Sequence, residues 1–385
     1  MRRRTVSFLG AAVLVAVLAG CGSNAAPVTT AETTAVTTEA APETTTETTA
    51  EAVTSAAQEE TTQAETTADA VSSASELLTG LDLTETIEEA HKLVYENENG
   101  DLVVSHKFGE TVMPENPQRI VSIKLEDLML ALDVDMVACR NFEGLYLEDE
   151  INALGIGTIT VDEEANTVNF EEVLSYKPDL IVIRDAFDQS IYDELSKIAP
   201  TIAFRLQNTK VSLVALGKAL GIEEKAIERL GEYEKKVAEA KETLKVVEGE
   251  QVSMLRILKK EIRLYPYSKN DMSNFLYLEL GLTPDPMVVE YDNADNLAIS
   301  MELLPNLTTD HMILIAGYGS NTDEAVKEAQ ARYDEIKADP LWQMVPAVQK
   351  GNVYEVDSRL WLTHGLIATE MKIDEVVDFL VPDTN

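Results

Sequence analysis

The chain has 385 residues, in which 68 acidic side chains outnumber 31 basic ones and give a formal net charge of −37. This excess argues against a nucleic-acid partner, because phosphate backbones are bound through clustered Lys and Arg. Two cysteines are too few for a disulfide framework or a four-thiolate zinc site. The length predicts about two domains, and the composition divides the chain into three unlike regions.

The amino terminus has the pattern of a secretory signal. Three arginines at 2–4 precede an apolar run at 6–18, which is too short for a permanent membrane helix but suits a signal-peptide core. The run ends in Leu-Ala-Gly-Cys and there resembles the lipobox of bacterial lipoproteins. The resemblance implies a signal peptide over 1–20, lipidation of Cys21 with fatty acids such as palmitate, and an extracytoplasmic protein anchored to the cell membrane. Cys139 then has no partner, and its apolar neighbours predict a buried thiol without chemistry.

Residues 22–100 are predicted to form a disordered tether. Most of this stretch is Thr, Ala, Glu and Ser, and it holds 16 acidic residues against one basic residue, Lys92. Such a segment buries too little apolar surface to offset the entropy of ordering, and like charges keep it extended. Whether the tether crosses a cell wall or carries glycans stays open. Its last part, 76–100, is transitional and has the pattern of a short helix leading into a strand.

The rest of the chain has the pattern of an α/β protein in two lobes. Short apolar runs alternate with amphipathic segments, which predicts in each lobe a mostly parallel sheet flanked by helices. The predicted strands lie at 102–104, 120–123, 136–139, 158–161, 180–183, 201–204, 252–258, 262–265, 311–317 and 352–356. A stripe of apolar residues three or four apart predicts one long helix at 222–247. This helix joins an amino-terminal lobe, 101–221, to a carboxyl-terminal lobe, 248–385, with a ligand cleft between them.

Basic residues follow four predicted strands of the amino-terminal lobe. They are Lys124, Arg140, Arg184 and Arg205. In open α/β sheets, ligands bind beyond the carboxyl ends of the strands, so these side chains are expected to line the cleft. Arg256 and Arg263 lie on consecutive strands of the second lobe, and a further arginine, Arg359, follows its last strand. A basic cleft in an acidic protein indicates an anionic ligand, since guanidinium groups pair with carboxylate, catecholate or phosphate oxygens.

Three aromatic residues are candidates for covering the apolar parts of the ligand. Tyr265 follows the strand of Arg263, Tyr318 follows the strand at 311–317, and Trp361 lies beside Arg359. Packing in the protein core is the alternative for each of them.

Five segments, in order along the chain, carry a resemblance to a known family. They are HKFGETVMPENPQRIVSI (106–123), VNFEEVLSYKPDLIVI (168–183), YDELSKIAPTIAF (192–204), IRLY (262–265) and GNVYEVDSRLWLTHG (351–365). Over 103–380 the chain resembles the periplasmic-binding-type lipoproteins that deliver iron–siderophore, haem or cobalamin to ABC importers. The resemblance implies a monomer with a rigid interlobe helix, limited hinge motion, and an ABC permease with its ATPase as partners. It also implies docking on the permease through one glutamate per lobe.

The docking glutamates implied by the resemblance are Glu171 and Glu279. Glu279 departs from the family pattern, because Leu278 falls where the acid is expected and a one-residue shift turns a helical side chain by about 100°.

The favoured ligand is an anionic ferric siderophore, with catecholate first, citrate or another carboxylate second, and hydroxamate third. Similar family members hold ferric catecholates with basic residues, and no enzymatic cofactor is implied. The alternative within the class is haem or cobalamin, for which His364 is the only plausible axial ligand. The histidines show no metal-binding spacing, and His106 and His311 are expected to be structural.

Other kinds of function have less support in the sequence. The phosphate-binding loop, the nucleophile elbow and the zinc-protease motif are all absent, so we do not expect an enzyme. A structural or adhesive surface lipoprotein would account for the Thr- and Glu-rich stalk, but not for cations at the strand ends.

Overall fold

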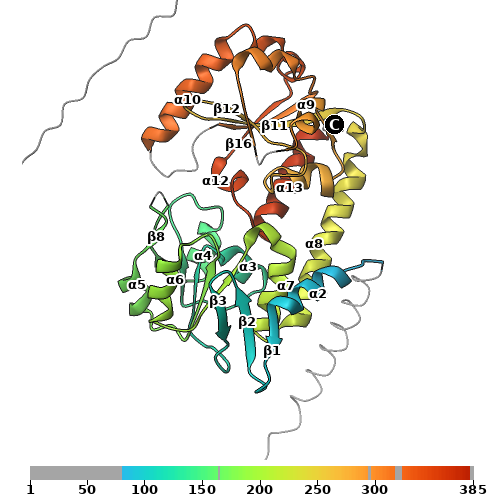
Figure 1. Ribbon diagram of the computed structural model, residues 1–385. Helices are drawn as coiled ribbons and strands as arrows, with labels where there is room; N and C mark the ends of the chain where they lie inside the picture. The colour runs from blue at the N-terminus through green and yellow to red at the C-terminus, as the bar shows by residue number, and fades with distance from the viewer. Residues whose placement is uncertain (1–79, 164, 294–295, 317–322, 382–385) are drawn as a thin grey trace, which may run out of the picture. The chain divides into compact units, whose positions relative to one another are not determined.

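The computed structural model describes residues 80–163, 165–293, 296–316 and 323–381 (Figure 1). All of them belong to one structural unit, Glu59–Asn385. The signal peptide, the lipidation of Cys21, the tether as far as residue 79, and Tyr318 lie outside the described residues.

An antiparallel sheet begins the described chain. Helix α2 (Thr84–Leu93) leads into a three-stranded sheet of β1 (Val94–Glu96), β2 (Leu102–His106) and β3 (Gly109–Val112). Ala90 and Val94 are fully buried in the core, and α2 packs against a helix of the amino-terminal lobe, α7 (Thr209–Ala219). The predicted helix and strand within 76–100 are therefore confirmed. The prediction of a disordered tether through residue 100 is wrong from residue 84 onward, because this segment buries apolar side chains.

The amino-terminal lobe is built on a five-stranded sheet in which every strand pairing is parallel. The strands, in spatial order, are β10 (Thr201–Phe204), β9 (Leu180–Arg184), β4 (Ile120–Ile123), β5 (Ala138–Arg140) and β6 (Gly157–Ile159). Successive side chains of β9 enter two different cores, Leu180 and Val182 in one and Ile181 and Ile183 in the other. Burial on both faces explains the continuous apolar strands of the sequence.

Short helices and a hairpin complete this lobe. They are α3 (Glu126–Ala131), α4 (Glu148–Ala153), α5 (Phe170–Ser175), α6 (Gln189–Ser196), the 3₁₀ turn η1 (Leu206–Asn208), and the hairpin strands β7 (Val161–Asp162) and β8 (Thr167–Val168). Cys139 is a buried free thiol, as expected.

One long helix, α8 (Glu223–Thr243), continues into the 3₁₀ turn η2 (Leu244–Val247) and leads to the second lobe. It packs on α7 and on the last helix, α13 (Leu366–Leu380), as Figure 1 shows. Arg229 makes a two-point ion pair with Glu370 of α13, with N–O distances of 2.8 and 2.5 Å. The close packing of α8 on α7 depends on Gly217 of α7. A Cβ atom at this position would lie 2.3 Å from the Cβ atom of Ala226 in α8.

The carboxyl-terminal lobe contains a mixed sheet. Its strands are β14 (Leu297–Ile299), β12 (Ile262–Leu264), β11 (Gln251–Ile257), β15 (His311–Ala316) and β16 (Val353–Val356), in that spatial order, with β13 (Thr283–Pro284) paired to β11. The pairings of β11 with β15 and of β15 with β16 are parallel. The β11–β12 pair is antiparallel because a short turn joins the two strands, and the β12–β14 pair is also antiparallel.

The remaining elements of this lobe are helical. They are the π-helix η3 (Phe275–Glu279), α9 (Pro286–Glu290), η4 (Met301–Asn306), α10 (Asp323–Ala338), η5 (Trp342–Met344), α11 (Pro346–Lys350), α12 (Ser358–Trp361) and α13. Within the described ranges, no helix combines the length and the apolar character that crossing a bilayer requires.

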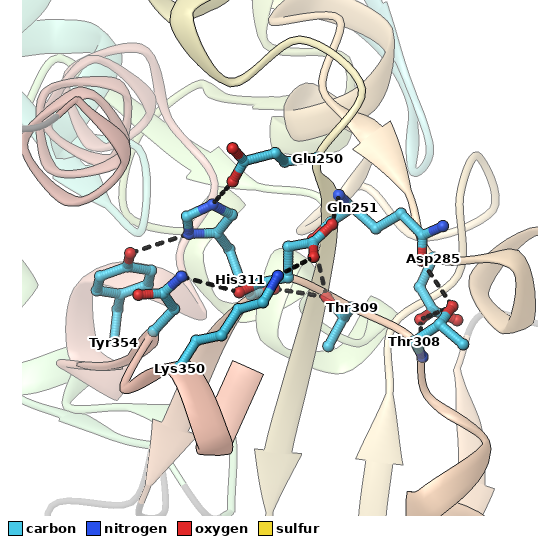
Figure 2. Close-up of polar contacts among 10 residues, drawn as sticks. Glu250, Gln251, Asp285, Thr308, Thr309, His311, Lys350 and Tyr354 are labelled. Carbon is cyan, nitrogen blue, oxygen red and sulfur yellow. Dashed lines mark hydrogen bonds and ion pairs between the residues drawn. The ribbon is translucent and has the colours of Figure 1, made fainter. Parts of the chain in front are cut away.

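A polar network ties together the amino ends of β11 and β15 (Figure 2). Because β16 is parallel to β15 and leads into α12, this network lies at the opposite end of the sheet from the α12 turn. His311 is buried, with Nε2 2.6 Å from a carboxylate oxygen of Glu250 and Nδ1 3.0 Å from the Tyr354 hydroxyl. This is the satisfied structural imidazole that the sequence predicts for His311.

We predict that residues 80–100 stabilise the amino-terminal lobe. A chain that begins at residue 101 should lose roughly 3 kcal/mol of unfolding free energy relative to one that begins at residue 80, because Ala90 and Val94 lose their burial. Chemical denaturation of both chains measures the difference. Val94→Asp in the longer chain should reproduce most of the loss, whereas Glu88→Gln on the exposed face of α2 should not. Equal stability of the two chains would contradict this prediction.

Candidate ligand-binding cleft

Three of the predicted cations meet at one edge of the amino-terminal sheet. Strands β9, β4 and β5 are parallel neighbours, so their carboxyl ends lie side by side. Lys124, Arg140 and Arg184 stand there and line a cavity of about 150 Å³, which we call the strand-end cavity. Its complete lining is Lys124, Glu126, Asp127, Arg140, Phe142, Tyr146, Glu163, Arg184, Leu206, Ser358, Arg359, Leu362, Thr363 and His364. Residues of both lobes therefore form its wall.

Two of these cations already have carboxylate partners. Lys124 Nζ lies 2.8 Å from Glu163 Oε2, and Arg140 donates to Glu163 Oε1 at 2.9 Å and to Glu126 Oε1 at 2.7 Å. Burial alone would lower the pKa of Arg140, but the Glu126 and Glu163 carboxylates outweigh burial and raise it. Carboxylates of the protein therefore balance the charges of Lys124 and Arg140.

Arg184 differs from Lys124 and Arg140. Among the described residues, no carboxylate lies within ion-pair distance of its guanidinium, and its buried Nε has no hydrogen-bond partner. Burial is the main cause that lowers the pKa of Arg184, although a guanidinium remains charged at neutral pH. A largely buried charge without a counterion is costly, so Arg184 is the group in this cavity that most needs an anion.

Arg205 lies nearby but does not line the strand-end cavity. It follows β10, is exposed, and has no carboxylate within ion-pair distance among the described residues. Its charge contributes to lowering the pKa of His364, after the larger effects of burial, Arg184 and Lys372. Arg205 is thus close enough to add positive potential at the cavity.

Three of the predicted residues of the second lobe lie elsewhere. Arg256 and Arg263 are directly opposite each other on β11 and β12, and Arg263 Nε donates to Glu261 at 3.0 Å. Tyr265 is buried, and Arg256 is close enough to hydrogen-bond with it. None of these three lines the strand-end cavity.

Trp361 is a core residue, so its prediction as a ligand-covering ring is wrong. Its side chain is 0% exposed and its indole N–H donates to Glu375 at 2.6 Å. The ring packs against Phe275, with centroids 6.0 Å apart. The α12 turn directs Trp361 inward, and it is Arg359 of the same turn that reaches the strand-end cavity, where it pairs with Asp357 at 2.8 Å. The aromatic lining comes instead from Phe142 and Tyr146, which the sequence analysis missed.

His364 lines both the strand-end cavity and a second cavity of about 150 Å³. Burial lowers the pKa of His364 to about 3, with Arg184, Lys372 and Arg205 acting in the same direction. The imidazole is therefore neutral at ordinary pH. Within the part of the chain that the structure describes, no group of three or more His, Cys, Asp or Glu side chains is arranged to hold a metal ion.

The second cavity also explains why Glu279 is unsuited to docking. Glu279 lines this cavity, accepts a hydrogen bond from Tyr233 at 2.7 Å and pairs with Lys210 at 3.3 Å. Leu278 is the residue that η3 presents to solvent, 50% exposed. Glu279 is therefore not a free surface acid, in agreement with its departure from the family pattern. Glu171 is exposed in the first turn of α5.

An acidic residue beside the cavity, Asp127, joins the two lobes. The helix α13 has no cap from its own preceding residue, Gly365, and Asp127 of the other lobe supplies it. Its carboxylate accepts from the backbone N–H groups of Ile367 at 3.2 Å and Ala368 at 3.0 Å, and from the Tyr146 hydroxyl at 2.7 Å. Gly365 is needed for the fit, because a Cβ there would lie 2.3 Å from the Asp127 carboxyl carbon. Asp127 lies three residues after Lys124, so its place near the end of β4 is the sequence signal for it.

We predict that Asp127 makes stability depend on pH. Burial raises the pKa of Asp127 from 3.8 to about 6, so the folded state holds the proton more tightly than the unfolded chain. The resulting stabilisation is complete below about pH 4 and is lost as the pH rises through 6, an amount of about 3 kcal/mol. Asp127→Asn should abolish this loss, measured as the difference in unfolding free energy between variant and wild type at pH 4 and pH 7.

Because the pKa of His364 is lowered, its titration changes stability with pH in the opposite direction. This effect is common to wild type and Asp127→Asn, so it cancels in the difference between their unfolding free energies. Asp149→Asn, on the exposed face of α4, is the matched control and should show no such change. A wild-type-to-Asp127→Asn difference that is independent of pH would contradict the prediction.

Comparison with known proteins identifies the family. Residues 127–360 match the family described as periplasmic binding protein. The chain is 28% identical to the probable siderophore-binding lipoprotein YfiY of Bacillus subtilis strain 168 over 72% of this chain and 87% of that protein. It is 26% identical to the Fe(3+)-citrate-binding protein YfmC of the same strain, over 71% and 84% respectively.

Among solved structures, SirA of Staphylococcus aureus complexed with staphyloferrin B is similar, with a TM-score of 0.62 and 25% identity over 72% of this chain and 98% of that chain. The likeness agrees with the two-lobed α/β fold described above. The family match covers more than half of the sequence. The chain therefore belongs to the periplasmic binding protein family, whose members bind substrates for transport rather than catalyse a reaction.

Proposed function

We propose that this protein is the extracytoplasmic substrate-binding component of an ABC importer, which captures an anionic ferric siderophore and delivers it to a permease. The family and the names of the relatives, which include siderophore-binding and Fe(3+)-citrate-binding proteins, support this class of ligand. The ligand is cargo and undergoes no reaction in the cleft.

The observation that carries the proposal is Arg184. Its guanidinium is largely buried at the carboxyl end of β9, lines the strand-end cavity, and has no carboxylate partner among the described residues. An anionic oxygen of the ligand would supply the missing counterion through a charge-assisted hydrogen bond. Arg205, exposed beside the cavity, would strengthen attraction of an anion from solution.

Ferric catecholate is the first ligand we propose, and ferric citrate or another carboxylate chelate is the second. Both are anionic and present oxygens that match a guanidinium. Phe142 and Tyr146 in the cavity wall offer aromatic surface for catechol rings, which favours the catecholate. Hydroxamate chelates rank third because they carry less negative charge.

Haem is a second candidate within the same class, and one observation favours it. His364 is a neutral imidazole that lines both cavities, and neutral imidazole is the form that ligates haem iron. Arg184 is largely buried and has no carboxylate partner among the described residues, which favours the anionic chelate over haem. The experiment below separates the two.

We also propose that a lipid anchor and a docking glutamate bring the protein to its permease. Lipid on Cys21 and the acidic segment before residue 80 would hold the binding lobes at the membrane surface as a monomer. Glu171, exposed on α5, is the proposed docking acid of the amino-terminal lobe.

We predict saturable quenching of tryptophan fluorescence when ferric catecholate is added to a chain that begins at residue 80. The two tryptophans, Trp342 and Trp361, are both buried, so quenching reports energy transfer to a chelate bound nearby. Ferric citrate, a ferric hydroxamate and haem are titrated in parallel. Saturation by haem alone, without quenching by either anionic chelate, would contradict the proposal.

Arg184→Ala is the variant that ties binding to the strand-end cavity. It should weaken binding of the anionic chelate by about 1–3 kcal/mol, the usual contribution of hydrogen bonds to charged groups. Arg332→Ala, on α10 and outside both cavities, removes the same charge and should leave the affinity unchanged.

A further inference from the structure

Glu163 stands in the strand-end cavity in the way that an anionic ligand group would. Its two carboxylate oxygens go to two different cations, Oε2 to Lys124 at 2.8 Å and Oε1 to Arg140 at 2.9 Å. A carboxylate that bridges an ammonium and a guanidinium satisfies both donors at once. Among the described residues, Glu163 is the only carboxylate within ion-pair distance of Lys124.

The position of Glu163 in the fold allows its side chain to leave. Glu163 lies in the turn between β7 and β8, a two-stranded sheet separate from the main sheet, and its side chain is 26% exposed. Asn166 in the same turn accepts from Lys124 at 2.9 Å and donates to the Ala186 carbonyl at 3.1 Å. The turn therefore stays attached to the sheet through Asn166 when the Glu163 side chain rotates into solvent.

The small size of the cavity favours such a change. The strand-end cavity measures about 150 Å³, whereas pockets for ligands of drug size occupy roughly 300–1,000 Å³. Helix α8 and the Asp127 cap of α13 hold the lobes together, so side chains of the wall are the parts most able to make room. Of the acidic side chains in the lining, Glu126 and Asp127 are almost fully buried, which leaves Glu163 as the exposed one.

We propose that Glu163 is an intramolecular counterion that occupies an anionic subsite between Lys124 and Arg140, and that a carboxylate or catecholate group of the ferric chelate replaces it. This inference rests on the function proposed above and assigns one contact region for that ligand. The exchange breaks two ion contacts of Glu163 and forms two equivalent contacts with the ligand, while Arg140 keeps Glu126 and Lys124 keeps Asn166.

The test compares Glu163→Gln with wild type in titrations of ferric catecholate, ferric citrate and a neutral ferric hydroxamate. Glutamine keeps the size of the side chain but removes the competing charge, so affinity for the anionic chelates should rise about tenfold while affinity for the neutral chelate does not rise. Glu150→Gln, an exposed residue of α4 outside the cavity, removes one negative charge from the same lobe and should leave all affinities unchanged.

A Lys124→Ala background and thermal melts separate competition from a purely structural role. If Glu163 competes with the ligand for Lys124, the gain from Glu163→Gln should shrink in Lys124→Ala protein that melts as a folded domain. Wild type that binds an anionic chelate as tightly as, or more tightly than, folded Glu163→Gln would overturn this inference and leave the proposed function intact. If no variant binds any anionic chelate, the proposed function and this inference both fail.

Discussion

Positive charge gathered at the edge of a parallel sheet is the constraint on which the rest of the site depends. Parallel pairing of β9, β4 and β5 places the carboxyl ends of the strands together, and each of these ends is followed or formed by a cation. Buried cations must be paired, and the protein pairs two of them with Glu126 and Glu163. Arg184 has no such carboxylate partner among the described residues, and we propose that the ligand balances its charge.

The junction between the lobes limits how the site can respond to a ligand. Packing of α8 on α7 and α13, the two-point Arg229–Glu370 ion pair and the Asp127 cap join elements that are far apart in the sequence. Wide closure of the lobes would break these buried contacts. Movement of partly exposed side chains in the cavity wall costs less free energy than movement of the lobes. Glu163 is the clearest case of such a side chain.

The sequence predicts the positions that follow from regular structure. Strand ends are marked by continuous apolar runs, and for this reason Lys124, Arg140 and Arg184 could be assigned to one edge of a sheet. It does not predict which face of a short turn is buried, so Trp361 was assigned to the ligand although it packs in the core. Nor does it predict partners such as Glu163 for Lys124, because these two residues meet only through tertiary structure.

The structure of the protein bound to a ferric catecholate or ferric citrate tests the central claim most directly. The account predicts an anionic oxygen of the chelate within about 3 Å of the Arg184 guanidinium, at the carboxyl ends of β4, β5 and β9. A chelate bound away from this edge, with Arg184 still lacking an anionic partner, would contradict it.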